Sequence, residues 1–200
     1  RDAATGELIW GIPSIRDVGR AMAADIDPRH RGVEVWSSDS RGVYSAQGHY
    51  ISNITPSINM AVWWDGDLNR ELLDNRTMRT NRGTERIISL TKWSEKGIKE
   101  IPLADQESAM TNNHTKANPM LQADILGDWR EEIVVRSADN KSVRIYTTDI
   151  PTEYRFHSLM SDEIYRWSVL TQNVAYNQPT QPGYYLGSDL GRFNKPTHLR

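Results

Sequence analysis

The sequence predicts an all-β fold, and three observations indicate it. Apolar residues gather in short, paired runs rather than in long ones. The 13 glycines and nine prolines interrupt the 200-residue chain at short intervals. No long segment keeps the period of an amphipathic helix. Many short strands with regular turns favour a sandwich, a barrel or a propeller over an alternating βαβ fold.

The expected strands are spaced along the whole chain. In order, they cover residues 33–37, 42–46, 60–64, 86–93, 133–136 and 142–147. Polar turn-forming tetrapeptides at residues 38–41 and 138–141 separate the first two strands and the last two, so each pair predicts a β-hairpin. Residues 1–10 indicate a further strand–turn–strand that begins midway. We therefore expect a fragment or a processed chain, the alternative being a mature N-terminus left by cleavage.

Two segments depart from the strand pattern. Residues 162–174 have room for a helical turn or two. Residues 105–120 are polar and poor in strand formers, which predicts a long loop. Long loops in compact domains often carry function.

The composition is that of a folded globular domain and excludes several classes of function. The 24 basic and 26 acidic residues leave a net charge of -2, so we expect neither nucleic acid nor a membrane surface as a partner. The absence of cysteine excludes disulfides, cysteine-ligated metals and a cysteine nucleophile. No apolar stretch is long enough for a transmembrane helix.

Three segments, the first, second and third acidic loops, repeat one pattern. In each, spaced carboxylates follow an apolar stretch, and a closing glutamate begins the next strand. The candidate metal ligands are Asp25, Asp27 and Glu34 in the first loop, Asp65, Asp67 and Glu71 in the second, and Asp124, Asp128 and Glu132 in the third. Calcium prefers oxygen ligands, and alternate residues of a tight loop can point carboxylates inward. One such loop is more often an ion-free turn, but three copies favour calcium binding.

Two pairs of adjacent residues invite a functional interpretation. Trp63 and Trp64 could stack on a sugar, but neighbouring residues of a strand point to opposite faces, so core packing is favoured. Glu131 and Glu132 diverge for the same reason, which argues against a pair of glycosidase carboxylates flanking one bond.

The longest informative segments extend over nearly the whole chain. They cover residues 23–36, 62–73, 123–148, 150–153, 172–179 and 183–187, and include Gly-Asp-Trp-Arg-Glu-Glu at residues 127–132. These segments resemble rhamnogalacturonan endolyases of polysaccharide lyase family 11. The resemblance implies an all-β chain that is part of an eight-bladed β-propeller with calcium-binding loops. Residues 1–200 would then be the C-terminal blades of a catalytic domain, and the remaining blades of the same enzyme would be their partner.

The family resemblance also implies an activity. Such lyases cleave the rhamnose–galacturonate backbone of pectin, rhamnogalacturonan I, by β-elimination, and leave an unsaturated galacturonate end. The family's substrate loop corresponds to Asn113, His114, Thr115 and Lys116, with Tyr176 nearer the C-terminus. Lys116 and His114 are the implied catalytic candidates, as base or carboxylate partner, and the other three would bind substrate. His114 stands where the family pattern has glycine. Several calcium ions and a secreted or periplasmic location are implied as well.

Two other functions compete with the lyase. One is a non-catalytic, calcium-stabilised, carbohydrate-binding propeller, and the other is an integrin-like propeller that binds proteins. The polar loop and Lys116 favour the lyase over the first alternative. The long segments shared with the lyases argue against the second.

Overall fold

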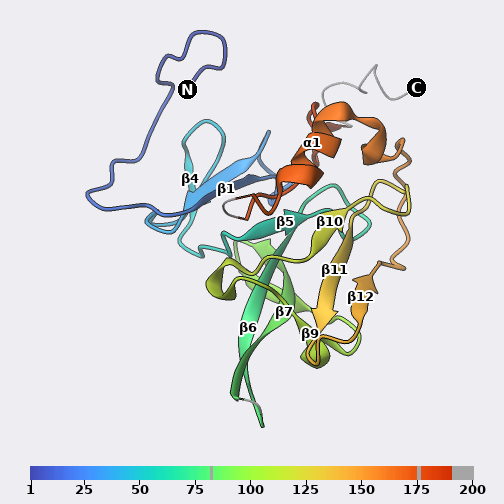
Figure 1. The fold of residues 1–200 in the computed structure, drawn as a ribbon. Coiled ribbons are helices and arrows are strands. Elements are labelled where there is room, and N and C mark those ends of the chain that lie inside the picture. Colours follow the sequence, from blue (N-terminus) through green and yellow to red (C-terminus); the bar gives the residue numbers. More distant parts are fainter. Residues whose placement is uncertain (82, 175–176, 191–200) are drawn as a thin grey trace.

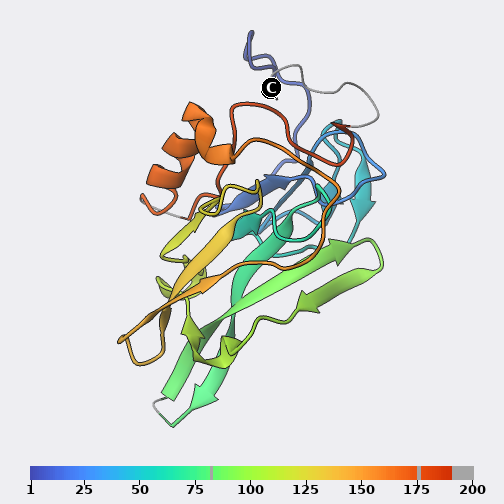
Figure 2. The same ribbon diagram turned by 90° about the vertical axis from the view of Figure 1, so that its right-hand side faces the viewer.

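The computed structural model describes residues 1–81, 83–174 and 177–190, and antiparallel strands dominate it (Figures 1 and 2). The strands are β1 (Ala21–Ala24), β2 (Glu34–Ser37), β3 (Val43–Tyr44), β4 (Tyr50–Ser52), β5 (Met60–Val62), β6 (Glu71–Thr80), β7 (Gly83–Ser94), β8 (Gly97–Ile101), β9 (Ala109–Met110), β10 (Leu121–Ala123), β11 (Glu132–Ser137) and β12 (Val143–Tyr146). The helical elements are the 3₁₀ turns η1 (Gln106–Ser108), η2 (His114–Lys116) and η3 (Leu159–Ser161) and the helix α1 (Glu163–Thr171).

The strands form two antiparallel sheets. The small sheet has the order β1-β2-β3-β4, a simple meander. The large, eight-stranded sheet has the order β10-β11-β9-β7-β6-β5, with β12 paired to β11 and β8 paired to β7. Both predicted hairpins are present, because β2 pairs with β3 and β11 with β12.

The expected eight-bladed propeller is wrong for this chain. Radial blades would be separate four-stranded sheets, whereas the large sheet is continuous. The short strand β9 makes the large sheet continuous, because Met110 pairs with Ile87 of β7 and with Arg136 of β11. The two sheets instead pack against each other as a β-sandwich, through a core to which both contribute.

Three buried apolar clusters hold this arrangement together. One includes residues of both sheets, with Trp36 from the small sheet packed together with Leu72 and Trp93 from the large one. A second lies within the large sheet and contains Trp64, and the third lies beneath α1 and contains Trp63. The two adjacent tryptophans are 2% and 5% exposed and serve different clusters, which confirms core packing over sugar stacking.

Two local predictions need correction. The N-terminal strand–turn–strand is absent, since no strand precedes Ala21 and residues 3–5 form only a turn. The sequence also missed most of β6, because its second half is polar and lacks alternation, yet it pairs with β7 along its whole length to Thr80. Long-range pairing therefore supplies the strand that local pattern does not indicate.

The helix α1 falls within the segment expected to hold helical turns. Asp162 caps it, since its carboxylate accepts hydrogen bonds from the backbone N–H groups of Ile164 and Tyr165. Tyr165 is its one buried residue and packs into the third cluster. Among the described residues, no helix is both long and apolar enough to cross a bilayer.

Candidate functional site

The predicted substrate loop is a short, exposed turn in the connection between β9 and β10. Asn113 precedes η2, which His114, Thr115 and Lys116 form. Asn113 and His114 have left-handed backbone angles, with φ of 57° and 47°, and Ala117 follows with 55°. Left-handed conformations are unfavourable for residues other than glycine, and they persist where the surroundings enforce them, often at functional sites. The glycine of the family pattern suits the same backbone position as His114.

A bridge of backbone hydrogen bonds closes the turn. The N–H of Asn112 donates to the carbonyl of Asn118 at 2.8 Å, and the reverse bond measures 3.2 Å. The side chain of Asn118 accepts from Asn113 and donates to Asn173, at 3.2 Å and 2.8 Å. The loop is therefore fastened at its base to the segment that follows α1.

Side chains from other strands hold the inner face of η2. Asn75 of β6 donates to the carbonyl of His114 at 2.6 Å. Asn59 and Arg20 donate to the carbonyl of Thr115 at 3.1 Å and 3.0 Å. With its carbonyls held inward, the turn leaves the side chains of Asn113, His114 and Thr115 exposed and that of Lys116 half-buried.

The structure thus brings together four of the five predicted substrate and catalytic residues. The fifth, Tyr176, lies outside the described residues. Sequence reasoning missed the three residues that fasten the turn, Arg20, Asn59 and Asn75. No local signal marks them, because each lies in a different part of the chain and becomes relevant only through folding.

The closing glutamates of the acidic loops share one structural role. Each uses a single carboxylate oxygen to accept two consecutive backbone N–H groups from the start of its own loop. The donors are Ile26 and Asp27 to Glu34 (both 2.9 Å), Trp64 and Asp65 to Glu71 (3.0 and 3.2 Å), and Ile125 and Leu126 to Glu132 (2.8 and 3.0 Å). The repeat in the sequence therefore corresponds to a repeated hydrogen-bonding arrangement, in which one glutamate closes each loop.

In the first and third loops, the other carboxylates accept hydrogen bonds from donors of the protein itself. Asp27 forms a forked pair with Arg29 through both of its carboxylate oxygens, whereas Asp128 accepts two hydrogen bonds from Arg130 on one oxygen. Asp25 accepts from the backbone N–H of Ser188 at 2.6 Å, and Asp124 from that of Leu159 at 2.7 Å. The structure does not bring the carboxylates of either loop together around one point.

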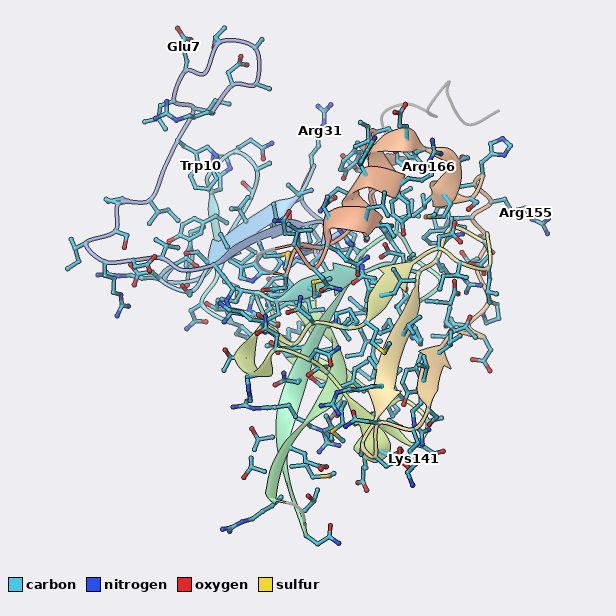
Figure 3. All side chains as sticks on the ribbon, viewed as in Figure 1. Glu7, Trp10, Arg31, Lys141, Arg155 and Arg166 are labelled. Carbon is cyan, nitrogen blue, oxygen red and sulfur yellow. The ribbon has the colours of Figure 1, made fainter. Side chains whose placement is uncertain are left out.

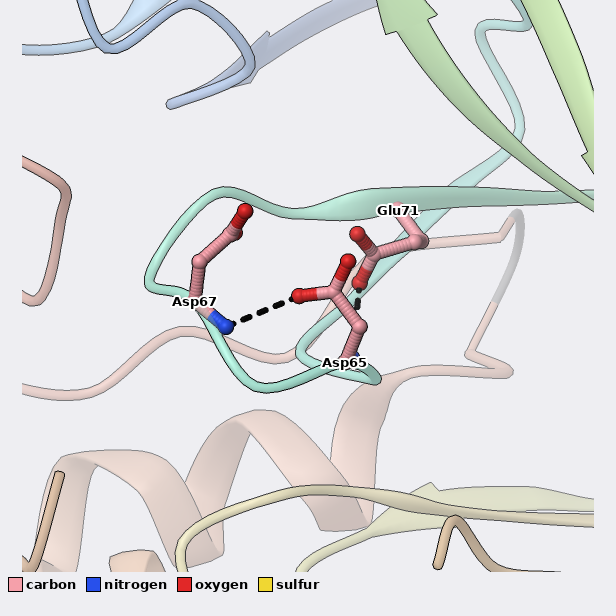
Figure 4. Close-up of side chains that lie close together, drawn as sticks. All are labelled: Asp65, Asp67 and Glu71. Carbon is pink, nitrogen blue, oxygen red and sulfur yellow. Dashed lines mark hydrogen bonds between the residues drawn. The ribbon is translucent and has the colours of Figure 1, made fainter. Parts of the chain in front are cut away.

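The second loop does bring its carboxylates together (Figure 4). Oxygen atoms of Asp65, Asp67 and Glu71 lie within 4.8 Å of one another, the one such group found among the described residues. The ammonium of Lys92 reaches into this group, 2.7 Å from Asp67 and 3.0 Å from Glu71, and it also pairs with Asp65. Burial alone would lower the pKa of Lys92, but the three carboxylates outweigh it and raise that pKa.

Glu131 and Glu132 point into different surroundings, as expected. Glu132 closes the third loop, whereas Glu131 is buried beside Arg70, with 3.5 Å between carboxylate and guanidinium. Burial lowers the pKa of Arg70. Its guanidinium also stacks 4.0 Å from the centre of the Trp63 ring. This buried pair contributes to the packing of the fold.

The burial of Glu34 predicts that its contribution to stability falls as the pH rises. Burial raises the pKa of Glu34 to about 8 from the 4.5 of an exposed glutamate. The folded state then binds its proton more tightly than the unfolded state, so this contribution is full below pH 4.5 and is lost as pH rises toward 8. We expect Glu34→Gln to flatten the fall in melting temperature between pH 5 and pH 8, measured with chelator present. An unchanged slope would contradict this contribution of the buried Glu34 carboxyl.

The fold and the candidate site define the class of this protein: a domain of two β-sheets with an exposed polar turn that is held by hydrogen bonds. A known family matches the sequence. Residues 1–196 match the family described as rhamnogalacturonan lyase family 11, C-terminal domain, and the chain therefore belongs to this family.

Relatives of known name share this similarity. The chain is 48% identical over 197 residues to the rhamnogalacturonan endolyase YesW of Bacillus subtilis (strain 168), covering 98% of the chain and 30% of YesW. It is 43% identical over 204 residues to the rhamnogalacturonan exolyase YesX of the same organism, covering 98% of the chain and 33% of YesX. The chain thus spans about a third of the length of these relatives.

Solved structures agree with this assignment. The rhamnogalacturonan lyase of Bacillus licheniformis superposes with a TM-score of 0.82 at 48% identity, over 94% of the chain and 30% of the lyase. The exotype lyase YesX superposes with a TM-score of 0.85 at 42% identity, over 94% of the chain and 32% of YesX.

Proposed function

We propose that this chain supplies the substrate loop of a rhamnogalacturonan lyase that cleaves by β-elimination. The observation that carries the proposal is the η2 turn, which holds Asn113, His114, Thr115 and Lys116 together on a backbone fixed from three other segments. Family membership supports it, since the relatives are named as lyases of this polymer. Because the polymer is too large to enter a cell, we expect the protein to act in the periplasm or outside the cell.

The reaction requires a base and a positively charged group that neutralises the carboxylate of galacturonate. The base removes the C5 proton of galacturonate, the electron pair forms the C4–C5 double bond, and the bond at O4 breaks with the leaving oxygen taking a proton. This C5 proton is barely acidic until the adjacent carboxylate is neutralised by positive donors. Lys116 and His114 can fill these roles, and we propose both as catalytic candidates, with Asn113, Thr115 and Tyr176 binding the sugars.

Formation of the unsaturated product tests the proposal. Rhamnogalacturonan I is incubated with the protein, and near-ultraviolet absorbance of the conjugated product is followed. We expect a steady rise in absorbance. Binding of the polymer without any rise, with the full polypeptide that carries these residues, would overturn the lyase and establish the alternative, a non-catalytic carbohydrate-binding domain.

We further propose that a calcium ion binds the second acidic loop. Its donor set is three converging carboxylates, which suits a hard cation, and one oxygen of each is within 4.8 Å of the others. Lys92 competes for the same position, since its ammonium already pairs with all three carboxylates. When bound, calcium would supply charge neutralisation at Asp65, Asp67 and Glu71 in place of Lys92.

The competition with Lys92 makes the calcium proposal testable. We expect calcium to raise the melting temperature of the Lys92→Met variant more than that of the parent protein, because the variant leaves three carboxylates without their cation. In chelator, Lys92→Met should be the less stable of the two. Lys141→Met, an exposed lysine on a distant turn, is the matched control (Figure 3). Equal calcium effects on all three proteins would overturn the site.

A further inference from the structure

We propose that Asp74 is a positioning residue for the lyase reaction at η2. Its carboxylate fixes the side-chain amide of Asn59 and the backbone of Asn75, and these two asparagines hold the turn. This inference rests on the proposed function and gives a role to an acidic residue that the sequence did not indicate. It is carried by the hydrogen bonds of Asp74 and by the burial of Asn59.

The side chain of Asn59 uses its complete hydrogen-bonding capacity. Asn59 lies directly before β5 and is 4% exposed, so its partners come from the protein. Its amide nitrogen donates to the Asp74 carboxylate at 2.7 Å and to the Thr115 carbonyl at 3.1 Å. Its amide oxygen accepts from the guanidinium of Arg20 and from the side-chain amide of Asn177, the latter at 3.3 Å. An asparagine amide has two hydrogens to donate and two lone pairs to accept with, and all four are used.

The Asp74 carboxylate decides which way this amide faces. A carboxylate only accepts hydrogen bonds, so it must face the nitrogen of the Asn59 amide. A half-turn of the amide would direct its oxygen at two acceptors, Asp74 and the Thr115 carbonyl, and would lose all four bonds. Two more donors hold the carboxylate itself, the Ser57 hydroxyl and the N–H of Asn75, the latter at 2.6 Å. The bond from Asn59 to η2 therefore depends on Asp74.

Two consecutive carbonyls of η2 depend on the same carboxylate. Asn75 donates to the His114 carbonyl at 2.6 Å, and Asn59 donates to that of Thr115. The turn needs this support because His114 has a left-handed φ of 47°, which is unfavourable for a residue other than glycine. Because Lys116 follows directly in the chain, the two bonds also fix where its side chain begins.

Asn59 also holds the segment that follows Tyr176 in the sequence. The side-chain amide of Asn177, which is 9% exposed, donates to the backbone carbonyl and to the side-chain oxygen of Asn59. Asn59 therefore joins the turn that carries Lys116 to the sequence neighbour of Tyr176. Displacing catalytic groups by about 1 Å can cost roughly 100-fold in rate, even when the altered residue lies away from the chemistry.

The experiment measures kcat and KM on rhamnogalacturonan I with the full polypeptide that carries these residues. Asp74→Asn keeps the size of the side chain and replaces one acceptor oxygen by a donor group. We expect kcat to fall by about 100-fold with KM little changed, because the groups that contact the substrate are all retained. Asp149→Asn, at an exposed aspartate that follows β12, is the matched control and should keep the parent values.

A reciprocal exchange separates positioning from stability. Asn59→Asp combined with Asp74→Asn restores the bond between the two side chains in the opposite direction. The carboxylate at position 59 then has no hydrogen to donate to the Thr115 carbonyl. We expect the melting temperature of this double variant to rise above that of Asp74→Asn while kcat stays low. Recovery of both quantities would show a purely structural role and overturn the inference.

Hydrogen exchange reports on the turn without any substrate. The N–H groups of Lys116 and Ala117 close η2 with hydrogen bonds of 3.0 Å and 3.2 Å. We expect Asp74→Asn to speed the exchange of these two amides by about 10-fold, the effect of one lost hydrogen bond of ordinary strength. If circular dichroism shows that this variant does not fold, Asn75→Ala, which removes the bond to the His114 carbonyl, replaces it.

The outcomes separate this inference from the proposed function. Product formation with parent-like kcat and exchange in Asp74→Asn, or losses equal to those of Asp149→Asn, would leave the lyase intact and overturn the inference. Asp74 also lines a pocket of about 400 Å³ beside η2, so a raised KM with unchanged kcat would indicate direct substrate contact and overturn positioning. Faster exchange in Asp74→Asn, with no unsaturated product from the parent protein, would overturn the lyase and support the hold of Asp74 on the turn.

Discussion

Replacing Glu131 by alanine is expected to lower the free energy of unfolding by about 3–5 kcal/mol, the cost of removing one partner of a buried ion pair. Glu131 is 1% exposed and Arg70 is 2% exposed, so neither charge can turn to water. The substitution would leave the Arg70 guanidinium without its counter-charge. It would also remove the acceptor for Trp63 N–H, Gln122 Nε2, Tyr165 Oη and Thr180 Oγ1.

We expect a large loss of stability because the four donors belong to different parts of the fold. Trp63 follows β5, Gln122 is in β10, Tyr165 is in α1 and Thr180 belongs to the C-terminal segment. One carboxylate therefore fastens the helix and the C-terminal segment to the large sheet. Buried donors left without an acceptor each add a desolvation penalty.

Equilibrium unfolding in urea measures the loss. Glu107→Ala, at an exposed glutamate of η1, is the control and should change the unfolding free energy by less than about 0.5 kcal/mol. The double variant with Arg70→Ala should lose less than the sum of the two single variants, because it removes the unpaired charge. A loss for Glu131→Ala as small as that of the control would show that the pair does not hold the fold.

Replacing Lys116 by alanine is expected to lower lyase activity by about 100- to 10,000-fold, the usual contribution of a positioned acid or base. The η2 turn fixes the backbone of Lys116, whose N–H donates to the carbonyl of Asn113 at 3.0 Å. Its side chain is half-buried and does not belong to the core, so the fold should remain intact.

A comparison of kcat with KM assigns the role of Lys116. If Lys116 is the base, Lys116→Arg should remain inactive with KM little changed, because an arginine keeps its proton. If it binds the carboxylate, Lys116→Arg should retain much of kcat and change KM. His114→Ala, measured beside it, distinguishes the two candidates. Wild-type kcat and KM in Lys116→Ala, with an unchanged melting temperature, would contradict any role in the reaction.

The sequence by itself determined the local features of this protein. Polar tetrapeptides between apolar runs predicted the β2–β3 and β11–β12 hairpins, and both are present. The spacing of the closing glutamates revealed a repeat, which the structure shows as two backbone N–H groups held by one carboxylate. Side-chain alternation placed Trp63 and Trp64 in the core. Shared segments indicated the family.

Only the tertiary structure decided how these parts combine. β9, two residues long, joins β7 to β11 and replaces the expected blades by one continuous sheet. Lys92 enters the second acidic loop from a neighbouring strand. Arg20 and Asn59 reach η2 from positions 95 and 56 residues away. Local periodicity reports how a segment buries one face, and it carries no information on which distant segment will lie against that face. For that reason the sequence indicated the loop residues, and the fold supplied the side chains that hold and surround them.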